Sequence, residues 1–356
     1  MLYLVDLPPP VHGMSAMNDK FIDYLGKGCV INTSPNFANR YFNSYVWIIC
    51  KLLITPVVLI SLLIAMIRGE RICYRSINGG IGQVFDILYL SFVRIFNLKI
   101  IIHHHSFNYL SEKKILFKLI SKIIGSKAIH VVLGDRMKLE LCSKYNIKPD
   151  QVLIISNSVF FAAEKIDRSN VIKKNITLGY ISNLTLEKGV GLFINMCISL
   201  RGLGYTFDAT IAGPISGDGV QECIDKFSYN SGFNYLGPVY DKDKQDFLKN
   251  IDIFVFPSRY KNEAEPLVLY EAAAYGARLV ATNAGCMADV VTSLMGDVIL
   301  IDENLEENLQ LKVSQLLDEY TYTDKLLLQK VFLDFIDSNR LSLSRLKKEV
   351  LGVPEA

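Results

Sequence analysis

Two glutamates in the C-terminal half of the chain have the types and spacing that best suit chemistry. Glu263 and Glu271 are separated by seven residues, and Pro266 between them marks the first turn of an expected helix, where its missing N–H costs little. Glu263 therefore falls in a polar loop after a buried strand, and Glu271 falls inside the helix. Two such carboxylates suit the hydroxyls of a sugar and a ribose, and the helix N-terminus favours bound anionic oxygens.

Three adjacent histidines end an apolar run in the first half of the chain. His103, His104 and His105 precede Ser106, and the residues before them predict a strand at 99–103. Alternation along a strand sends His103 and His105 to one face and His104 to the other. Neighbours on a strand cannot all converge on one ion, and no further cluster of His, Asp or Glu accompanies them, so we expect no metal site.

Short β-branched runs alternate with helical patterns along the chain, which is typical of α/β folds with parallel, doubly wound sheets. The first half predicts strands at 3–6, 29–32, 71–74, 99–103, 128–133 and 152–155. Helices are expected between them at 18–25, 45–67, 86–96, 112–124 and 136–145. The second half predicts strands at 176–182, 208–212, 234–236, 253–256 and 278–282, with helices at 189–203, 220–227, 242–250, 266–275 and from about 306.

The length of 356 residues exceeds the size at which one hydrophobic core usually keeps growing, so we expect two domains. A polar segment at 162–175 lacks an apolar period and predicts a linker. We place an N-terminal Rossmann-like domain at 1–165, a second one at 166–335, and a C-terminal helix at 336–356, for which a return to the first domain is one option. Ligands in such sheets bind at the carboxyl ends of strands, so the cleft between the domains is the expected active site.

Composition argues against several other classes of protein. The net charge of +2 gives no reason to expect a nucleic-acid partner held by a broad basic surface. The seven cysteines include no Cys-x-x-Cys pair and are expected to be buried thiols in a reducing compartment. The first residues lack the basic leader of a signal peptide, so we expect a cytoplasmic protein.

The stretch from Val46 to Ile67 is almost continuously apolar and is long enough to span a bilayer, which needs about 20 residues. In a doubly wound domain this position must hold a helix, and a true span would break the sheet. We therefore expect a long helix that contacts the membrane from one side. Lys51 and Arg68 near its ends would extend toward the lipid head groups.

The segment from Phe256 to Gly276 resembles the family-4 retaining glycosyltransferases of the GT-B fold, whose mark is two glutamates separated by seven residues. The resemblance implies that Glu271 holds the ribose of a nucleotide sugar and that Glu263 holds the transferred sugar. Leu267 and Val268 would belong to the same donor site. Glu265 stands where the family commonly has an apolar or aromatic residue, and its role is open.

The resemblance extends to Gly179–Gly189, where the family usually places an arginine and a lysine against the donor diphosphate. Lys188 matches, but Asn183 stands where arginine is usual, and Arg259 is a speculative substitute. The alternative for Lys188 is a surface lysine near a helix start, where the helix dipole does not favour a cation. His105 matches a family histidine that contacts the donor sugar near the reacting carbon, with a structural histidine as the alternative.

The first half contains two glycine-containing loops, and the one around Gly13 resembles the family's loop that lines the donor phosphates and the acceptor. Gly13 follows the first strand, permits close approach of the backbone to a ligand, and is assigned to the donor. His12, His103 and Gly80 are assigned to the acceptor side. A simple strand-to-helix turn is the alternative for the loop around Gly13.

The resemblance implies a retaining transfer of a sugar from a UDP- or GDP-linked donor to a glycan on polyprenyl diphosphate, as in bacterial O-antigen or capsule synthesis. The enzyme would be cytoplasmic and peripheral to the inner membrane, and would need no metal or other cofactor. One alternative is an inverting GT-B transferase or a nucleotide-sugar epimerase. Another is a non-catalytic, membrane-associated module that binds nucleotide sugars.

Overall fold

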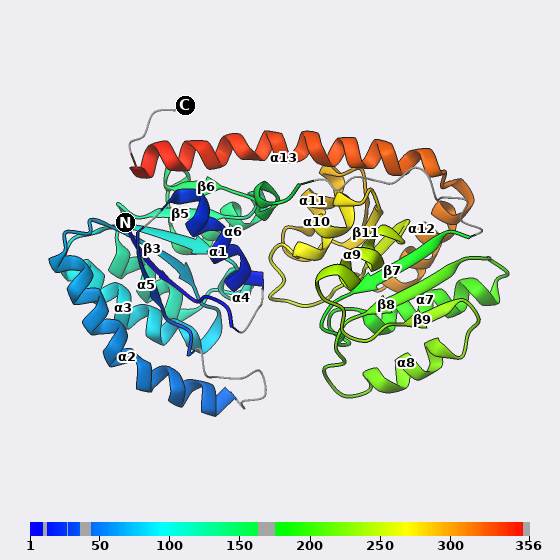
Figure 1. The fold of residues 1–356 in the computed structure, drawn as a ribbon, viewed down its shortest axis with the longest axis horizontal. Coiled ribbons are helices and arrows are strands. Elements are labelled where there is room, and N and C mark those ends of the chain that lie inside the picture. Colours follow the sequence, from blue (N-terminus) through cyan, green and yellow to red (C-terminus); the bar gives the residue numbers. More distant parts are fainter. Residues whose placement is uncertain (10–12, 27, 36–43, 163–174, 352–356) are drawn as a thin grey trace. The chain divides into compact units, whose positions relative to one another are not determined.

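The computed structural model describes residues 1–9, 13–26, 28–35, 44–162 and 175–351. It divides the chain into two compact units. The N-terminal unit comprises Met1–Phe160 together with Arg340–Ala356, and the C-terminal unit comprises Phe161–Asn339 (Figure 1). Most of the expected linker, at 163–174, lies outside the described residues.

The N-terminal unit is built on a parallel six-stranded sheet with the order β2-β1-β3-β4-β5-β6. Its strands are β1 Leu2–Val5, β2 Cys29–Asn32, β3 Ile72–Ile77, β4 Lys99–His104, β5 Ile129–Val132 and β6 Val152–Ile154. Its helices are α1 Gly13–Leu25, α2 Ser44–Ile67, α3 Gln83–Ile95, α4 Asn108–Ser111, α5 Ile115–Ile124 and α6 Asp135–Tyr145. Short 3₁₀ helices at Gly80–Gly82, Pro149–Gln151 and Asn157–Phe160 complete it.

The C-terminal unit holds a second parallel six-stranded sheet, with the order β12-β11-β10-β7-β8-β9. Its strands are β7 Thr177–Ile181, β8 Asp208–Ala212, β9 Phe233–Tyr235, β10 Ile253–Phe256, β11 Arg278–Thr282 and β12 Asp297–Ile299. Its helices are α7 Val190–Gly202, α8 Val220–Ser228, α9 Asp241–Lys249, α10 Leu267–Ala274, α11 Met287–Ser293 and α12 Leu305–Glu319. The long helix α13, Tyr322–Leu351, follows and ends within the N-terminal unit.

The two strand orders confirm the predicted class of two Rossmann-like, doubly wound domains. Taking β7 to β12 as strands 1 to 6, the C-terminal sheet reads 3-2-1-4-5-6 from β9, which is the order of dinucleotide-binding Rossmann folds. Strand β12 was absent from the expected set. Its three residues are defined by their pairing with β11 rather than by a pattern along the chain.

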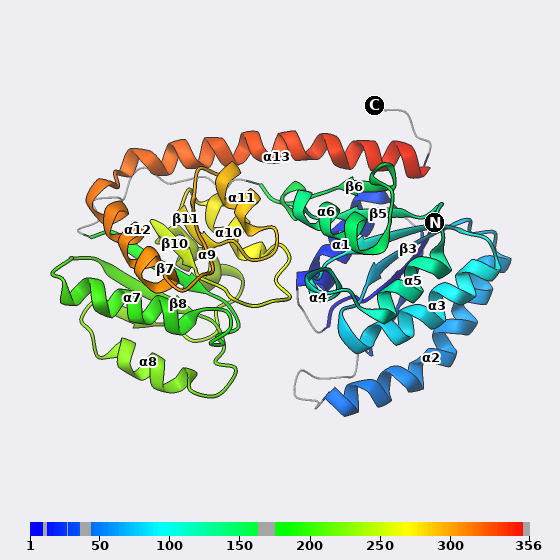
Figure 2. The same cartoon turned by 180° about the vertical axis from the view of Figure 1, so that it is seen from behind.

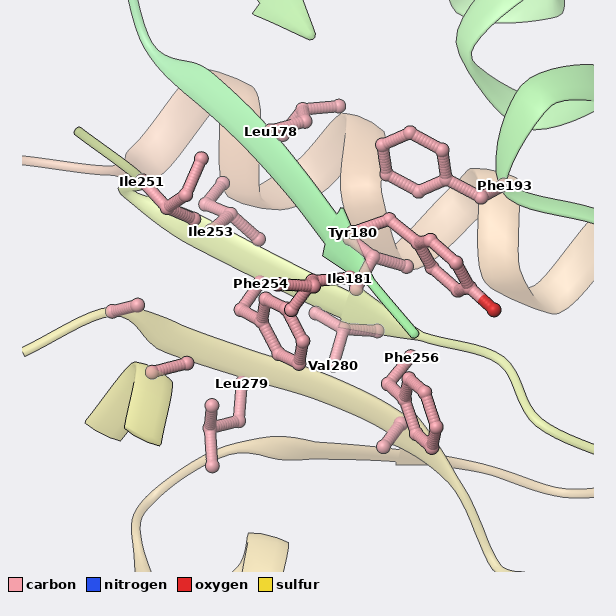
Figure 3. Close-up of a cluster of buried hydrophobic side chains, with 14 of the residues drawn as sticks. Leu178, Tyr180, Ile181, Phe193, Ile251, Ile253, Phe254, Phe256, Leu279 and Val280 are labelled. Atoms are coloured by element: carbon pink, nitrogen blue, oxygen red, sulfur yellow. The ribbon is translucent and has the colours of Figure 1, made fainter. Parts of the chain in front are cut away.

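Apolar side chains from the central strands of the C-terminal sheet form a continuous core (Figure 3). All four residues of β10 are buried, as expected for a parallel strand that is covered on both faces. A methyl group on Gly179 in β7 would lie 2.5 Å from the side chain of Ile251. The absence of a side chain at Gly179 therefore lets the chain before β10 pack directly on β7.

The core of the N-terminal unit is completed by the end of α13. Leu343 and Leu346 are buried in the same cluster as Tyr3 of β1 and Phe21 of α1. Helix α2 contacts α3, and α3 contacts α5. Helix α2 lies beside α3 in both views (Figures 1 and 2). Leu343 and Leu346 are thus part of the structure of the N-terminal unit although they come from the end of the chain.

Four charged side chains are buried together in the N-terminal unit. Arg75 of β3 donates from Nε to Asp86 Oδ1 over 2.9 Å and from Nη1 to Thr33 Oγ1 over 2.8 Å. Lys51 of α2 lies with its Nζ 3.3 Å from Asp6 Oδ2. Burial would raise the pKa of Asp6, but the nearby Lys51 and Arg75 outweigh it and hold that pKa below its usual value.

The expected position of Lys51 at a membrane surface is therefore wrong. Its side chain is fully buried and lies over the ring of Trp47, 4.5 Å from the centroid, as well as beside Asp6. The reason is helical geometry, because residue 51 shares a buried stripe with Thr55, Val58 and Leu62. Arg68, just after α2, is exposed.

Replacing Arg75 by methionine should destabilise the N-terminal unit by about 3–5 kcal/mol, because it leaves Asp86 buried without its cation. Urea unfolding followed by fluorescence would measure this, since Trp47 is the only tryptophan of the chain and lies in this unit. The control is Lys114→Met, which breaks an exposed pair with Glu112 and should cost about 0–1 kcal/mol. Equal losses in the two variants would contradict the role given to the buried charges.

Candidate functional site

The segments predicted to carry chemistry in the C-terminal unit meet where the strand order of its sheet reverses. Strands β7 and β10 pair at this point, and ligands of open α/β sheets bind outside the carboxyl ends of such strands. The chain leaves β7 toward Asn183 and Lys188, and it leaves β10 toward Glu263. The fold therefore brings together two predicted groups of residues that are far apart in the sequence.

Gly189 allows the start of α7 to pack against the end of β10. It precedes the helix with φ +88°, and a methyl group there would lie 2.2 Å from the carbonyl oxygen of Pro257. The Arg259 amide also donates to the Glu187 carbonyl oxygen over 2.8 Å. As a result the Nζ of Lys188 lies 3.6 Å from Glu263 Oε2.

Glu263 is a nearly buried carboxylate with two partners. Its Oε2 lies 3.4 Å from the Ser258 hydroxyl, which donates to it, and faces Lys188. Burial raises the pKa of Glu263, while Lys188 and Ser258 oppose that rise. A carboxylate held in this way can accept a hydrogen bond from a ligand hydroxyl without first being taken out of water.

The turn at 284–286, which follows β11, packs on the backbone that carries Glu263. A methyl group on Gly285, which has φ +53°, would lie 2.2 Å from the Glu263 carbonyl oxygen. The Cys286 amide donates to the Ala264 carbonyl oxygen over 2.8 Å, and the Thr282 hydroxyl donates to the Ser258 carbonyl oxygen. The loop after β10 is thus held from both sides, by Gly189 and by Gly285.

The second glutamate lies in α10, which begins after Pro266 rather than at it. Glu271 Oε1 accepts a hydrogen bond of 2.7 Å from Lys244 of α9. Its Oε2 is buried and has no hydrogen-bond partner among the residues that the structure describes. Leu267 and Val268 are half-buried in the first turn of the same helix.

The remaining candidates of this unit have simpler surroundings. Glu265, whose role was open, is buried, and the Tyr270 hydroxyl donates to its Oε1 over 2.7 Å, which ties the loop to α10. Asn183 and Arg259 are exposed. Their predicted contacts with the donor stay predictions.

The histidines of the N-terminal unit form two hydrogen-bonded groups. His103 Nδ1 lies 2.6 Å from the Tyr74 hydroxyl, and its ring lies 4.0 Å from that of His105, so the two share a face as predicted. His104 Nε2 lies 3.0 Å from His130 Nδ1 on the other side. Burial lowers the pKa values of His103 and His104 well below the usual value, and lowers that of His130 to about 4.

Of the two predicted glycine positions, Gly13 begins α1 and is exposed. Gly80 has φ +57°, and its amide donates to Asn108 Oδ1 over 3.0 Å. His12 lies outside the described residues. His103 is buried. The assignments of His103 and Gly80 to the acceptor side, and of His105 to the donor sugar, stay predictions.

Sequence reasoning missed two residues that contact the glutamates. Ser258 directly follows the Pro257 that ends a buried strand, and this position was a usable signal. Lys244 had no such signal, because it is one of several charged residues on a polar helix and lies 27 residues from Glu271.

Comparisons with known proteins find a family match and similar folds. Residues 162–327 match the family described as glycosyl transferases group 1. No curated protein matches the chain. Among solved structures, HepE from Anabaena, in complex with UDP, aligns with a TM-score of 0.72 at 12% identity over 99% of this chain and 100% of its own.

Two further solved structures are similar over the whole chain. A glycosyltransferase from Rickettsia africae aligns with a TM-score of 0.69 at 16% identity, over 98% of each chain. WaaG, a glycosyltransferase involved in lipopolysaccharide biosynthesis, aligns with a TM-score of 0.62 at 13% identity, over 99% of this chain and 100% of its own. At these identities the likeness shows the fold, which is GT-B.

Replacing Gly285 by alanine should loosen the loop that carries Glu263, because the added methyl group overlaps the Glu263 carbonyl oxygen. We expect a loss of about 1–3 kcal/mol from overpacking, in addition to the strain of a positive φ. Hydrogen exchange of residues 258–264, read by mass spectrometry, should become faster. The control is Gly204→Ala, which has φ +94° but nothing within 4 Å, and should leave this loop unchanged. Unaltered exchange in the Gly285 variant would contradict the prediction.

Proposed function

We propose that the chain, a glycosyltransferase by its group 1 domain and GT-B fold, transfers a sugar from a nucleotide-sugar donor with retention of configuration. The observation that carries the proposal is the placement of the two glutamates. Glu263 and Glu271 are presented after β10, at the point where the strand order reverses, and each faces a lysine. A UDP-linked donor is supported by HepE, which was solved with UDP and with UDP-glucose.

In the proposed mechanism the glutamates bind the donor and do not attack it. Glu271 accepts a hydrogen bond from a ribose hydroxyl at Oε2, which has no partner among the described residues, and Glu263 accepts one from the transferred sugar. Both side chains are fixed by neighbours before the donor arrives. Binding therefore needs little reordering of the protein, which favours reaction of the bound sugar.

The transfer itself is proposed to occur on one face of the sugar. The bond between the anomeric carbon and the diphosphate oxygen breaks, and the acceptor oxygen forms its bond on the same side. The acceptor's proton passes to the departing diphosphate. Lys188, near the N-terminus of α7, offsets the negative charge that gathers on that group, and the mechanism uses no metal ion or other cofactor.

Four further residues are proposed for the donor site on the strength of the family resemblance. Asn183 and the exposed Arg259 would assist Lys188 at the diphosphate, although asparagine supplies no charge where the family usually has arginine. His105 would contact the sugar near its reacting carbon. Gly13 would let the backbone approach the donor.

Removing either glutamate should disable transfer, because each is proposed to hold a different part of the donor. We expect Glu263→Gln to lower kcat at least about 100-fold, and Glu271→Ala to raise the KM for the nucleotide sugar about tenfold or more. Release of nucleotide from a panel of UDP- and GDP-sugars would measure both. The control is Glu222→Gln, an exposed carboxylate on α8.

Each of the following outcomes would contradict the proposal. Turnover and KM that are both unchanged in Glu271→Ala would contradict the role of that residue, and wild-type protein that binds nucleotide sugars without turning them over would favour the non-catalytic binding module. Product whose anomeric configuration is inverted, as read by NMR, would favour an inverting transferase of the same fold, and conversion of the nucleotide sugar without transfer would favour an epimerase.

We propose further that the acceptor is a lipid-linked glycan of bacterial surface polysaccharide, O-antigen included, and that the enzyme is cytoplasmic and binds the inner membrane through α2. Within the described residues, Val46–Ile67 is the one helix segment long and apolar enough to cross a membrane. Its buried stripe covers the sheet, yet its outer side is also apolar, which is unusual for a surface helix. The exposed residues there are Ile49, Leu52, Leu53, Val57, Ile60, Leu63, Ile64 and Ile67.

Charges placed on the outer side of α2 should weaken membrane binding at least about tenfold, because they cannot enter the acyl region without a large desolvation cost. The variant is Leu53→Glu with Val57→Glu and Ile60→Glu, tested by flotation with phosphatidylglycerol-containing vesicles. The control places glutamate at Leu203 and Leu311, which are equally exposed apolar residues of the C-terminal unit. Wild-type protein that fails to float, or equal flotation of both variants, would contradict the proposal.

A further inference from the structure

We infer that Lys244 is a positioning residue of the nucleotide site, which holds Glu271 so that one carboxylate oxygen is presented to the ribose of the donor. The inference rests on the proposed function and adds a residue to it. Lys244 lies on α9, which precedes β10, and Glu271 lies on α10, which follows it. Their two side chains meet although the helices lie on either side of β10 in the sequence.

The contact between the two side chains is short and partly buried. Lys244 Nζ lies 2.7 Å from Glu271 Oε1, a distance typical of a charge-assisted hydrogen bond. The Lys244 side chain is 29% exposed and that of Glu271 is 23% exposed. This partial burial reduces screening by water, so the pair restrains the carboxylate more firmly than a surface pair would.

The surroundings of the other carboxylate oxygen of Glu271, Oε2, indicate that a ligand binds there. Oε2 is buried and has no hydrogen-bond partner within the part of the chain that the structure describes. A buried acceptor without a donor costs free energy, and such an atom in a native protein calls for an explanation. A carboxylate oxygen accepts only, so the missing group must be a donor, and a ribose hydroxyl supplies one.

Lys244 differs in this respect from the other charged residues of its helix. The remaining charged side chains of α9 are exposed, and Lys249 forms an ion pair with Asp246 on the same helix, 3.4 Å away. Among the residues that the structure describes, Lys244 is the member of this helix that forms an ion pair with another element. Lys242, two residues earlier and exposed, is therefore a matched control of the same type on the same helix.

The expected consequence is a loss of donor affinity without an equal loss of chemistry. Without Lys244, the Glu271 side chain regains rotamer freedom, which must be given up again when the donor binds. We expect Lys244→Met to raise the KM for the nucleotide sugar about tenfold and to change kcat less than about threefold. Lys244→Arg, which keeps the cation, should restore most of the lost affinity.

The test compares UDP, or GDP if only that nucleotide binds, with its 2′,3′-dideoxy form by isothermal titration calorimetry. Lys244→Met should weaken the binding of the parent nucleotide about tenfold, and Lys242→Met should leave it unchanged. The dideoxy nucleotide lacks both ribose hydroxyls and should bind more weakly to the wild type. Its affinity should not fall further in Lys244→Met, because Glu271 then has no hydroxyl to accept from.

Other results would overturn the inference. If Lys244→Met weakened both nucleotides by the same factor, Lys244 would contact the diphosphate or the base directly. If it weakened neither, the ion pair would serve folding alone, which a lowered Tm would show. Wild-type protein that bound neither UDP nor GDP would instead overturn the proposed function, and the inference with it.

Discussion

The close approach of two glycines to the loop after β10 is the constraint on which the C-terminal site depends. At Gly189 and at Gly285 an added methyl group would lie 2.2 Å from a backbone oxygen of that loop, on Pro257 and on Glu263 respectively. Close backbone contact replaces side-chain packing here, so the position of the Glu263 carboxylate is set by main-chain atoms. The Lys188 ammonium comes within reach of Glu263 because Gly189 follows it in the chain.

Each glutamate of the site has a lysine partner from a neighbouring segment, and the two pairs differ in a useful way. Lys188 lies 3.6 Å from Glu263, beyond ordinary hydrogen-bond distance, whereas Lys244 lies 2.7 Å from Glu271. A loosely held cation can turn toward an incoming diphosphate at small cost, and a tightly held one fixes its carboxylate. The geometry thus agrees with one lysine that serves the leaving group and one that serves the nucleoside.

The N-terminal unit uses buried charge for a different purpose. Arg75 and Asp6 lie on or just after β3 and β1, which are the strands at which the order of that sheet reverses. Asp86 also accepts from the Asn78 amide over 2.9 Å, so the charges hold the loop before Gly80. Lys51 ties α2 into the same group, and the outer side of that helix is apolar.

The sequence alone determined the α/β class and most strands and helices, and it identified Glu263 and Glu271 as the residues to examine. It could do so because the hydrophobic period, the positions of proline and glycine, and the spacing of the two glutamates are local properties. It could not determine β12, whose three residues are defined by pairing, or the burial of Lys51, whose ion partner lies 45 residues away. The strand orders and the Lys244–Glu271 contact are likewise long-range. Only the tertiary structure decided them, since such contacts depend on how crossover connections return the chain to the sheet.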